Sequence, residues 1–398
     1  MSVTVVGIGA DGWPGLAPPA RRAVHDAEVV LGARRQLALL PAEVPARRVA
    51  WPSPMMPALP GLLAEHAAAR TVVLASGDPM FFGLGAAVAR EVPDAAVLPH
   101  PSSVALACAR LRWAAQDVDV VSVVARPVAT LRAAFAPRRR LLVLAEDAGT
   151  PAAVAALLTG AGYGSSTMTV LSSLGSDTEA RADGVATSWT HRGGDPLAVV
   201  AIACADDPDD PLLGRAPGLP DDAYDHDGQL TKAEVRVLTV TALRPTPGAL
   251  LWDVGGGAGS IGVEWMRHHP SCRAIGVEPR ADRAARITAN AAALGVPGLR
   301  VVVGRAPAAL EGLEAPDAVF VGGGVTEPGM LERCRTALRP GGRLVANAVT
   351  VEGEAVLYAA RAEHGGRLRR LAVDRAEPVG RFSGWRALAP VTQWEVRV

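Results

Sequence analysis

One stretch in the second half of the chain, Leu250 to Ser260, constrains the possible fold more than any other. Apolar residues on both sides of Asp253 predict a buried strand, and helical spacing resumes at Ile261. Between strand and helix, the glycines at 255, 257 and 259 let the backbone turn sharply and approach a ligand closely. A strand, a glycine turn and a helix in this order predict an α/β fold with a nucleotide pocket at the end of the strand.

The next predicted strand, 274–278, ends in Glu278, 25 residues after Asp253. A carboxylate at that place can accept hydrogen bonds from both hydroxyls of a ribose. The turn lacks the last glycine of the dinucleotide fingerprint, and no basic residue follows it for a pyrophosphate. These features favour S-adenosylmethionine over NAD. A tight turn that binds nothing is the remaining interpretation.

The composition argues against several classes of protein. Lys+Arg and Asp+Glu both number 40, so the formal charge is zero, which argues against a nucleic-acid or membrane-surface binder. No charged region precedes the first apolar stretch and no apolar run could span a bilayer, so we expect a cytoplasmic protein. The four cysteines contain no CxxC pair and predict reduced core thiols, with no metal site: Cys108, Cys204, Cys272 and Cys334.

The first half has a second glycine turn, residues 7–12, directly after a strand from Val3 to Val6. A further strand, Thr71 to Ala75, runs into Ser76-Gly77-Asp78-Pro79, which places Asp78 at a carboxyl end. Strands then alternate with helices up to a strand over 197–204, which predicts open α/β sheets with sites at strand ends.

The second half opens with Thr231-Lys232-Ala233-Glu234, a capping box that predicts a helix to about Leu243. Seven strands can be counted if 368–373 and 393–398 pair as a final hairpin. Before this half, residues 206–222 are rich in Asp, Pro and Gly without periodicity, which is typical of a domain linker.

Both halves also carry the motifs of known families. Residues 1–205 resemble the tetrapyrrole methylase family through four motifs in order: Val6 to Gly12, Ser76 to Gly83, Pro101-Ser102-Ser103 and Gly149-Thr150-Pro151. Residues 225–398 are similar to the decarboxylating partner of that family through five segments: Asp227 to Lys232, the Asp253 turn, Glu278, Phe320 to Gly324 and Leu344 to Thr350. The whole chain therefore resembles the bifunctional, decarboxylating precorrin-6Y methyltransferases of cobalamin biosynthesis.

This resemblance implies a two-lobed tetrapyrrole methylase fold, then a linker at 206–224 and a Rossmann-like seven-stranded methyltransferase domain. It implies two S-adenosylmethionine sites per chain, C5 methylation by the first domain, and C15 methylation with decarboxylation of the C12 acetate by the second, giving precorrin-8X. The implied partners are a polycarboxylate tetrapyrrole and further copies of the chain, as a dimer or tetramer. The alternatives are the same chemistry on a cobalt-containing intermediate, a nucleic-acid methyltransferase, or a cofactor-binding scaffold without activity.

The resemblance also implies roles for individual residues. In the second domain Glu278 would bind the ribose, Asp253 would fix the turn or meet the amino group, and the other cofactor contacts would come from Gly255, Gly257, Gly259, Ser260 and the main chain of Arg305 and Ala306. In the first domain the cofactor pocket would be lined by Gly9, Gly77, Asp78, Met80, Ser102 and Thr150.

Lys232 and Asn347 are the candidates for the substrate in the second domain. Lys232 is the sole lysine, which suggests a need for a compact ammonium to meet a substrate carboxylate, although a leftover surface lysine is an alternative. Asn347 would hydrogen-bond the ring or its acetate, or is a satisfied core amide. Arg381 and Arg386 are weaker candidates for a carboxylate.

The chain departs from the family patterns in two places. The first family usually has Ser-x-His-Gly-Arg where this chain has Val124 and Ala125 in place of His and Gly. In the second domain an acidic residue usually follows the glycine that ends the fourth strand, and here Arg305 follows Gly304.

Overall fold

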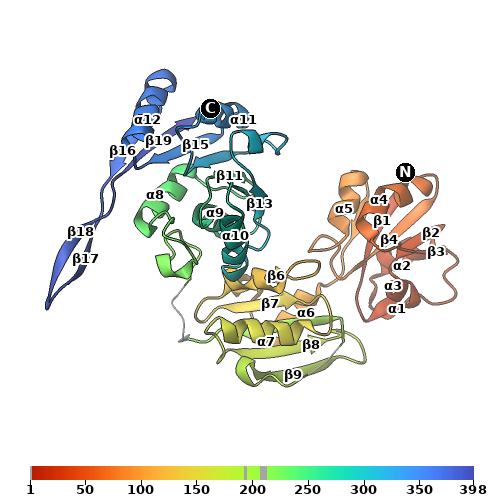
Figure 1. Ribbon diagram of the computed structural model, residues 1–398. Coiled ribbons are helices and arrows are strands. Elements are labelled where there is room, and N and C mark those ends of the chain that lie inside the picture. Colours follow the sequence, from red (N-terminus) through yellow and green to blue (C-terminus); the bar gives the residue numbers. More distant parts are fainter. Residues whose placement is uncertain (1, 192–194, 207–212) are drawn as a thin grey trace. The chain divides into compact units, whose positions relative to one another are not determined.

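The computed structural model describes residues 2–191, 195–206 and 213–398. The chain forms two compact units (Figure 1). Unit 1 comprises Met1–Val128 and Pro137–Asp210, and unit 2 comprises Ala129–Ala136 and Pro211–Val398.

The first sheet of unit 1 has five parallel strands in the order β3-β2-β4-β1-β5. Its strands are β1 (Ser2–Ile8), β2 (Val29–Gly32), β3 (Arg47–Ala50), β4 (Arg70–Ser76) and β5 (Ala96–Leu98). Its helices are α1 (Gly12–Gly15), α2 (Pro18–His25), α3 (Arg34–Ala38), α4 (Met55–Glu65) and α5 (Gly85–Glu91). The central strands are apolar on both faces because helices cover both: Val6 of β1 packs in one core cluster and Val5 in the other.

The second sheet of unit 1 is mixed, in the order β6-β7-β10-β8-β9. Its strands are β6 (Val118–Ser122), β7 (Arg140–Leu144), β8 (Thr167–Ser172), β9 (Ala180–Val185) and β10 (Ala198–Ala203). Helices α6 (Ser103–Leu111) and α7 (Thr150–Gly160) belong to this part. Helix α6 is capped at its start by Ser102, whose side chain accepts the N–H of Ala105 at 3.0 Å. Strands β3, β5 and β9 were not predicted, since they lack a buried apolar run.

Unit 2 contains a seven-stranded sheet in the order β13-β12-β11-β14-β15-β19-β16. Its strands are β11 (Leu250–Val254), β12 (Arg273–Glu278), β13 (Arg300–Val303), β14 (Ala318–Val321), β15 (Arg343–Ala348), β16 (Arg367–Leu371) and β19 (Val391–Arg397). The first five are parallel, and the predicted pairing of the last two is confirmed as antiparallel. The strand order reverses at β11, so the glycine turn after this strand lies where ligands bind in such sheets.

The helices of unit 2 are α8 (Ala233–Leu243), α9 (Ser260–His268), α10 (Ala281–Ala293), α11 (Met330–Ala337) and α12 (Val351–His364). The predicted helix at α8 is confirmed, but the predicted capping box is wrong. Lys232 is the N-cap without a side-chain cap, and the Asp221 Oδ1 accepts the N–H of Ala233 at 3.0 Å. A carboxylate from a preceding segment therefore takes the place that the sequence pattern assigned to Thr231.

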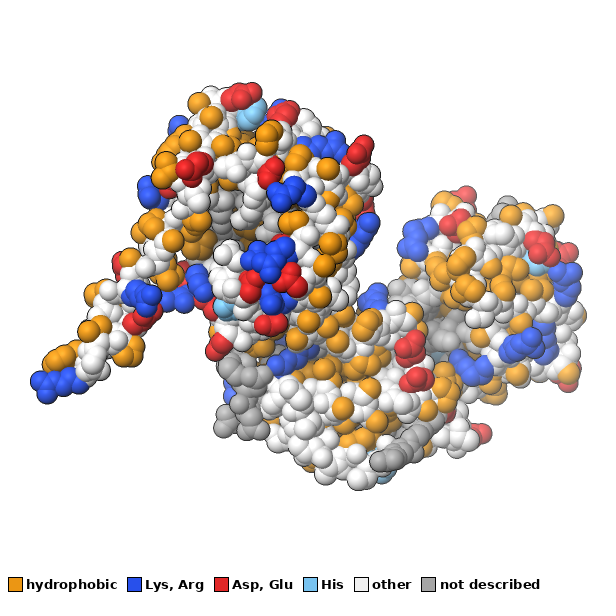
Figure 2. All heavy atoms as spheres, viewed as in Figure 1, with side chains coloured by type: hydrophobic (Ala, Val, Ile, Leu, Met, Phe, Trp, Pro, Cys, Tyr) orange, Lys and Arg blue, Asp and Glu red, His pale blue; other side chains and the backbone are white. Residues whose placement is uncertain are grey.

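A two-stranded hairpin, β17 (Asp374–Val379) and β18 (Phe382–Ala387), was also not predicted. It extends away from the seven-stranded sheet of unit 2 (Figure 1). Figure 2 shows hydrophobic side chains along this projection, and the exposed ones include Phe382 and, at 79 % exposure, Trp385.

The interval predicted as a linker, 206–224, lies only partly within the described residues. Its residues 207–212 are outside them, whereas the part from Leu213 onward contacts unit 2. Leu219 and Tyr224 are buried in the core of that unit, since both are apolar enough to pack against α8 and α9. We therefore propose that the second domain begins at or before Leu213.

Three further features concern the whole described chain. All four cysteines are buried, as expected for core thiols. Every described helix is too short or too polar to span a bilayer. The described residues contain no group of three or more His, Cys, Asp or Glu that could hold a metal ion.

Candidate active sites

Unit 2 has a cavity of ≈ 660 Å³ at the carboxyl ends of its parallel strands. This volume is within the range of small-molecule sites, about 300–1,000 Å³. The cavity is lined at strand ends by Gly255, Gly257, Ser260, Glu278, Gly323 and Asn347, and elsewhere by Lys232, Arg283, Arg305 and Ala306. Most of the predicted site residues of the second domain thus meet in one place.

The glycine turn forms one wall of this cavity. Gly255 has φ +71° and packs against Gly323, whose nitrogen would lie 2.6 Å from any Cβ added to Gly255. Two glycine segments therefore touch here, and a side chain on Gly255 would separate them. Gly259 is not part of the wall, because it packs against Ile287 of α10.

Glu278 is buried at the end of β12 and holds this turn in place. Its Oε2 accepts the N–H of Gly257 at 3.0 Å, and its Oε1 accepts the N–H of Arg280 at 3.2 Å. Each carboxylate oxygen has a second lone pair, so both can also accept a hydroxyl from a ligand in the cavity. The geometry fits a ribose site whose acceptor also shapes the turn.

Asp253 lies behind the turn and is 1 % exposed. Its Oδ2 accepts the N–H of Gly262 at 2.9 Å, which ties β11 to α9, while its Oδ1 is buried without a partner among the described residues. Burial raises the pKa of Asp253 to about 7, opposed by the hydrogen bond from the N–H of Gly262 and assisted by the nearby charge of Glu278. Asp253 is not among the residues that line the cavity, so the geometry favours its role in fixing the turn over a contact with the amino group of a cofactor.

The segment after β13 contributes Arg305 and Ala306 to the cavity. The Arg305 side chain is 73 % exposed and donates to the Glu327 Oε1 at 2.9 Å. Ala306 is buried. At Arg305, where the family usually has an acid, the guanidinium points to Glu327, so recognition of an adenine here would fall to the main chain.

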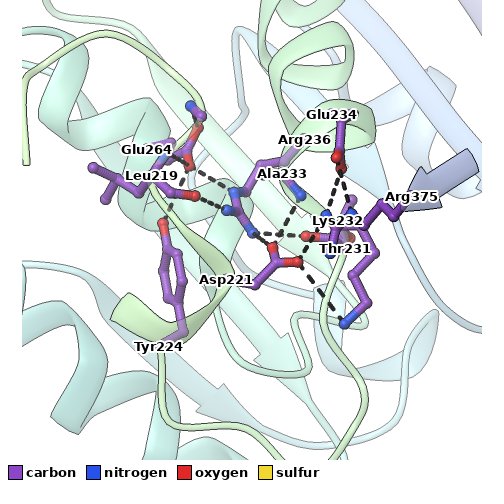
Figure 3. A network of polar contacts seen from close by, with 11 residues as sticks. Leu219, Asp221, Tyr224, Thr231, Lys232, Ala233, Glu234, Arg236, Glu264 and Arg375 are labelled. Carbon is purple, nitrogen blue, oxygen red and sulfur yellow. Dashed lines mark hydrogen bonds and ion pairs between the residues drawn. The ribbon is translucent and has the colours of Figure 1, made fainter. Parts of the chain in front are cut away.

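Lys232 lines the cavity at the start of α8, next to a network of charged side chains (Figure 3). Its Nζ lies 3.9 Å from the Asp221 Oδ2. The same carboxylate receives closer contacts from Arg375, at 3.0 Å, and from Arg236, at 3.4 Å. Lys232 therefore has the longest contact of the three cations around Asp221, and its side chain is 35 % exposed.

Arg236 is the centre of this network and is fully buried. Its Nε donates to the Glu264 Oε1 at 2.6 Å, and its other nitrogens donate to the carbonyls of Thr231 and Leu219. Glu264 also accepts the Tyr224 hydroxyl and the N–H groups of Gly218 and Leu219. Because buried charges are stable only when their partners are complete, this network fixes the segment before α8 and with it Lys232.

Asn347 lies at the end of β15 and lines the cavity, and both ends of its amide have a partner. Its Nδ2 donates to the Thr239 Oγ1 at 3.1 Å, and its Oδ1 accepts from the Gln393 Nε2 at 2.9 Å. The geometry favours the interpretation of Asn347 as a core amide. Arg381 and Arg386 lie on the hairpin, where Arg386 donates to Glu377, and neither lines the cavity.

Unit 1 has a smaller cavity, ≈ 240 Å³. Of the residues predicted for the first cofactor pocket, it is lined by Gly9, Gly77, Asp78 and Ser102. Met80 and Thr150 are not among its lining residues. The Met80 N–H donates to the Asp78 Oδ1 at 2.9 Å, and the Thr150 hydroxyl accepts the N–H groups of Glu146 and Asp147, so both shape the turns beside the cavity.

The cavity of unit 1 also includes residues that sequence reasoning did not assign: Arg35, Ser76, Phe81 and Phe82. Ser76 and the two phenylalanines lie within a motif quoted for the resemblance, so the motif itself could have indicated them. Arg35 carries no local signal. In the loop whose sequence departs from the family pattern, Val124 lines the cavity. Ala125 has φ +54°, a left-handed conformation suited to the glycine that the family has there.

Two family models, one for each half of the chain, identify it as a two-domain methyltransferase. Residues 2–188 match the model of the tetrapyrrole (corrin/porphyrin) methylases, and residues 222–398 match that of the precorrin methyltransferase domain. The chain belongs to the family of precorrin-6Y C(5,15)-methyltransferases (decarboxylating).

Three relatives document this membership. A precorrin-6Y C(5,15)-methyltransferase (decarboxylating) from a Sinorhizobium species is 46 % identical over 98 % of this chain and 95 % of its own length. One from Mycobacterium tuberculosis strain H37Rv is 46 % identical over 99 % of both chains. A probable cobalt-precorrin-6B C(15)-methyltransferase (decarboxylating) from Pyrobaculum calidifontis is 33 % identical over 44 % of this chain and 93 % of its own.

Proposed function

We propose that this chain methylates precorrin-6Y at C5 and C15 and removes the carboxyl group of its C12 acetate, giving precorrin-8X. The observation that carries the proposal is the cavity of unit 2, where Glu278 and the Gly255 turn meet Lys232. The full-length identity to precorrin-6Y methyltransferases supports the choice of substrate.

The proposal includes two S-adenosylmethionine sites in each chain. Both cavities lie at strand ends beside glycine turns, and in unit 2 the paired oxygens of Glu278 fit a cofactor with a ribose. Bound S-adenosylmethionine supplies an electrophilic methyl group. Calorimetry on the intact chain should give two sites, and one site per chain would contradict this part of the proposal.

The protein contributes by aligning the methyl donor with the acceptor carbon and by enclosing both. Methyl transfer is an in-line displacement, and a well-aligned pair of reactants can lower the barrier by roughly 7–11 kcal/mol at best. The turn held by Glu278 fixes the donor side, and Lys232 would hold a carboxylate of the acceptor. Each methyl group replaces a hydrogen of the macrocycle, so each transfer releases one proton.

Decarboxylation requires a place for the electron pair of the broken carbon–carbon bond. The conjugated ring accepts this pair, carbon dioxide leaves, and a proton takes the place of the carboxylate. The residues around Lys232 need only hold the acetate out of the ring plane and exclude water. We assign this step and C15 methylation to the second domain, residues 225–398 with the preceding segment, and C5 methylation to the first, residues 1–205.

Mass spectrometry of precorrin-6Y incubated with the intact chain and S-adenosylmethionine tests the assignment. The product should gain two methyl groups and lose carbon dioxide. A product that keeps its carboxyl group, or exhaustive reaction that stops at one methyl group, would contradict it. The same assay with the cobalt-containing substrate tests the alternative favoured by the relative from Pyrobaculum calidifontis.

We also propose that the chain forms a homo-oligomer through the hairpin of β17 and β18. Phe382, Trp385 and Val379 are between 63 % and 79 % exposed on this projection, and a second copy would bury them. Light scattering of Trp385→Ala should show smaller particles than the wild type. An unchanged mass would place the interface elsewhere.

A further inference from the structure

The cavity of unit 1 contains a single cation among its described lining residues, Arg35 of helix α3. The Arg35 Nη2 donates to the hydroxyl oxygen of Ser76, at the end of β4, at 3.2 Å. The Gln36 Nε2 donates to the same oxygen at 3.1 Å, and the Gln36 Oε1 accepts the N–H of Ala33 at 2.8 Å. These contacts place the guanidinium and the hydroxyl side by side at the cavity.

The Ser76 hydroxyl is left as a donor by this arrangement. A hydroxyl oxygen has two lone pairs, and Arg35 and Gln36 use both. None of the hydrogen bonds between described residues uses the Ser76 proton. The hydroxyl and the remaining N–H groups of Arg35 are therefore neighbouring donors, the arrangement that binds a carboxylate.

The acids near Arg35 already have their own donors. Partial burial lowers the pKa of Arg35, and Asp195 acts in the opposite direction. Asp195 accepts the N–H of Leu197 at 2.8 Å and also the hydroxyl of Ser173, while Asp78 accepts the N–H of Met80. Within the described residues Arg35 is in no ion pair, so its charge is available to a ligand.

The surface beside this cation is apolar. Phe81 and Phe82 line the cavity with their rings 5.0 Å apart, edge to face, and Val124 lines it as well. All three are exposed, Phe82 and Val124 by more than half. An apolar surface next to a cationic donor pair fits a ligand with a flat apolar body and acidic arms.

We propose that Arg35 and Ser76 form a carboxylate-binding subsite that holds one acidic side chain of the tetrapyrrole methylated by the first domain. This inference rests on the proposed function and adds the group that orients the substrate there. Arg35 contacts the substrate and takes no part in the transfer itself, so its loss should weaken substrate binding more than it slows turnover at saturation.

The test compares Arg35→Ala with Arg34→Ala in the intact chain. Arg34 is the neighbouring exposed arginine of the same helix and does not line the cavity, so it is a matched control for charge. Arg35→Ala should raise the KM for precorrin-6Y in C5 methylation by at least about tenfold, as expected for a lost charged hydrogen bond. Arg34→Ala should leave it unchanged, and Arg35→Lys should restore part of the loss.

Two internal controls separate the possible failures. C15 methylation and decarboxylation, followed by mass spectrometry in the same reactions, report on the second domain and should not change. Calorimetric affinity for S-adenosylmethionine should also stay unchanged in Arg35→Ala. Three results would contradict the proposed subsite. They are equal effects of both arginine variants, a fall in kcat without a rise in KM, and a loss of affinity for S-adenosylmethionine. Absence of any methylation by the wild type would instead overturn the proposed function.

A binding measurement independent of methyl transfer uses uroporphyrin I, a stable tetrapyrrole with eight carboxylates, as the probe. The wild type should bind it in a salt-dependent manner, and Arg35→Ala should lose one class of binding site that Arg34→Ala keeps. Equal binding by both variants, or no binding by the wild type, would count against the subsite.

Discussion

The Lys232 Nζ lies 3.9 Å from the Asp221 Oδ2, while Arg236 and Arg375 make closer contacts with the same carboxylate. Arg236 is fully buried, and Arg375 joins the base of the hairpin to Asp221 and Glu234. Asp221 therefore holds three cations at the start of α8, and only Lys232 of the three lines the cavity. Of the three cations, Lys232 is therefore the one that a substrate carboxylate in the cavity can contact.

Lys232→Ala should raise the KM for precorrin-6Y in C15 methylation by about tenfold, because a substrate carboxylate would lose a charged donor. Lys232→Arg should also raise it, since a guanidinium can reach Asp221 with two N–H groups and would be drawn into the network, away from the substrate. Steady-state kinetics at saturating S-adenosylmethionine measures both. Arg333→Ala, at an exposed arginine, is the control for charge. If both lysine variants have the same kinetics as this control, Lys232 does not bind the substrate.

Glu278→Ala should weaken S-adenosylmethionine binding in the second domain by at least about tenfold and leave the other site unchanged. Glu278→Gln should lose less, because an amide oxygen can still accept the N–H of Gly257. Calorimetry on the intact chain resolves the two sites, with exposed Glu311→Ala as the control. Equal losses at both sites would indicate misfolding and not a lost contact.

The pKa of Asp253 predicts a pH dependence of stability. Its folded-state pKa is raised from 3.8 to about 7 by burial. The folded state therefore favours the protonated carboxyl, so this contribution to stability is fully present below pH 3.8 and is lost as the pH rises through about 7.

Asp253→Asn removes this titration and keeps an acceptor for the N–H of Gly262. Its free energy of unfolding relative to the wild type should rise between pH 5 and pH 8, by at most about 1.4 kcal/mol per pH unit. Denaturant titration of both proteins at several pH values measures the difference. Parallel pH profiles would show that Asp253 titrates normally.

The packing of residues 213–224 predicts where the second domain can be cut. A fragment 213–398 keeps Leu219, Asp221 and Tyr224, whereas a fragment 225–398 removes partners of Arg236 and Glu264. Buried charged groups that lose hydrogen-bond partners are destabilised, so the longer fragment should melt at the higher temperature. Thermal unfolding of the two purified fragments decides this, and equal melting temperatures would mean that the segment adds no stability.

Local patterns in the sequence were sufficient for much of the fold. The buried strands of the parallel sheets, the glycine turn after β11 and Glu278 at the end of β12 all follow from apolar runs bounded by turn residues. The antiparallel pairing of β16 with β19 was predicted from the same kind of signal. Such features depend on residues close together in the chain, and their physical cause is periodicity of burial.

The side-chain partners were decided by tertiary structure alone. Thr231 was expected to cap α8, yet Asp221 caps it, and Arg375 reaches Asp221 across 154 positions of the chain. Arg35 reaches Ser76 across 41 positions. A charged or hydroxyl side chain has several possible partners of the same chemistry, and only the packing of the cores places one of them within hydrogen-bond distance. The sequence by itself therefore determined the sheets and the turns at their ends, while the packed structure decided which side chains meet there.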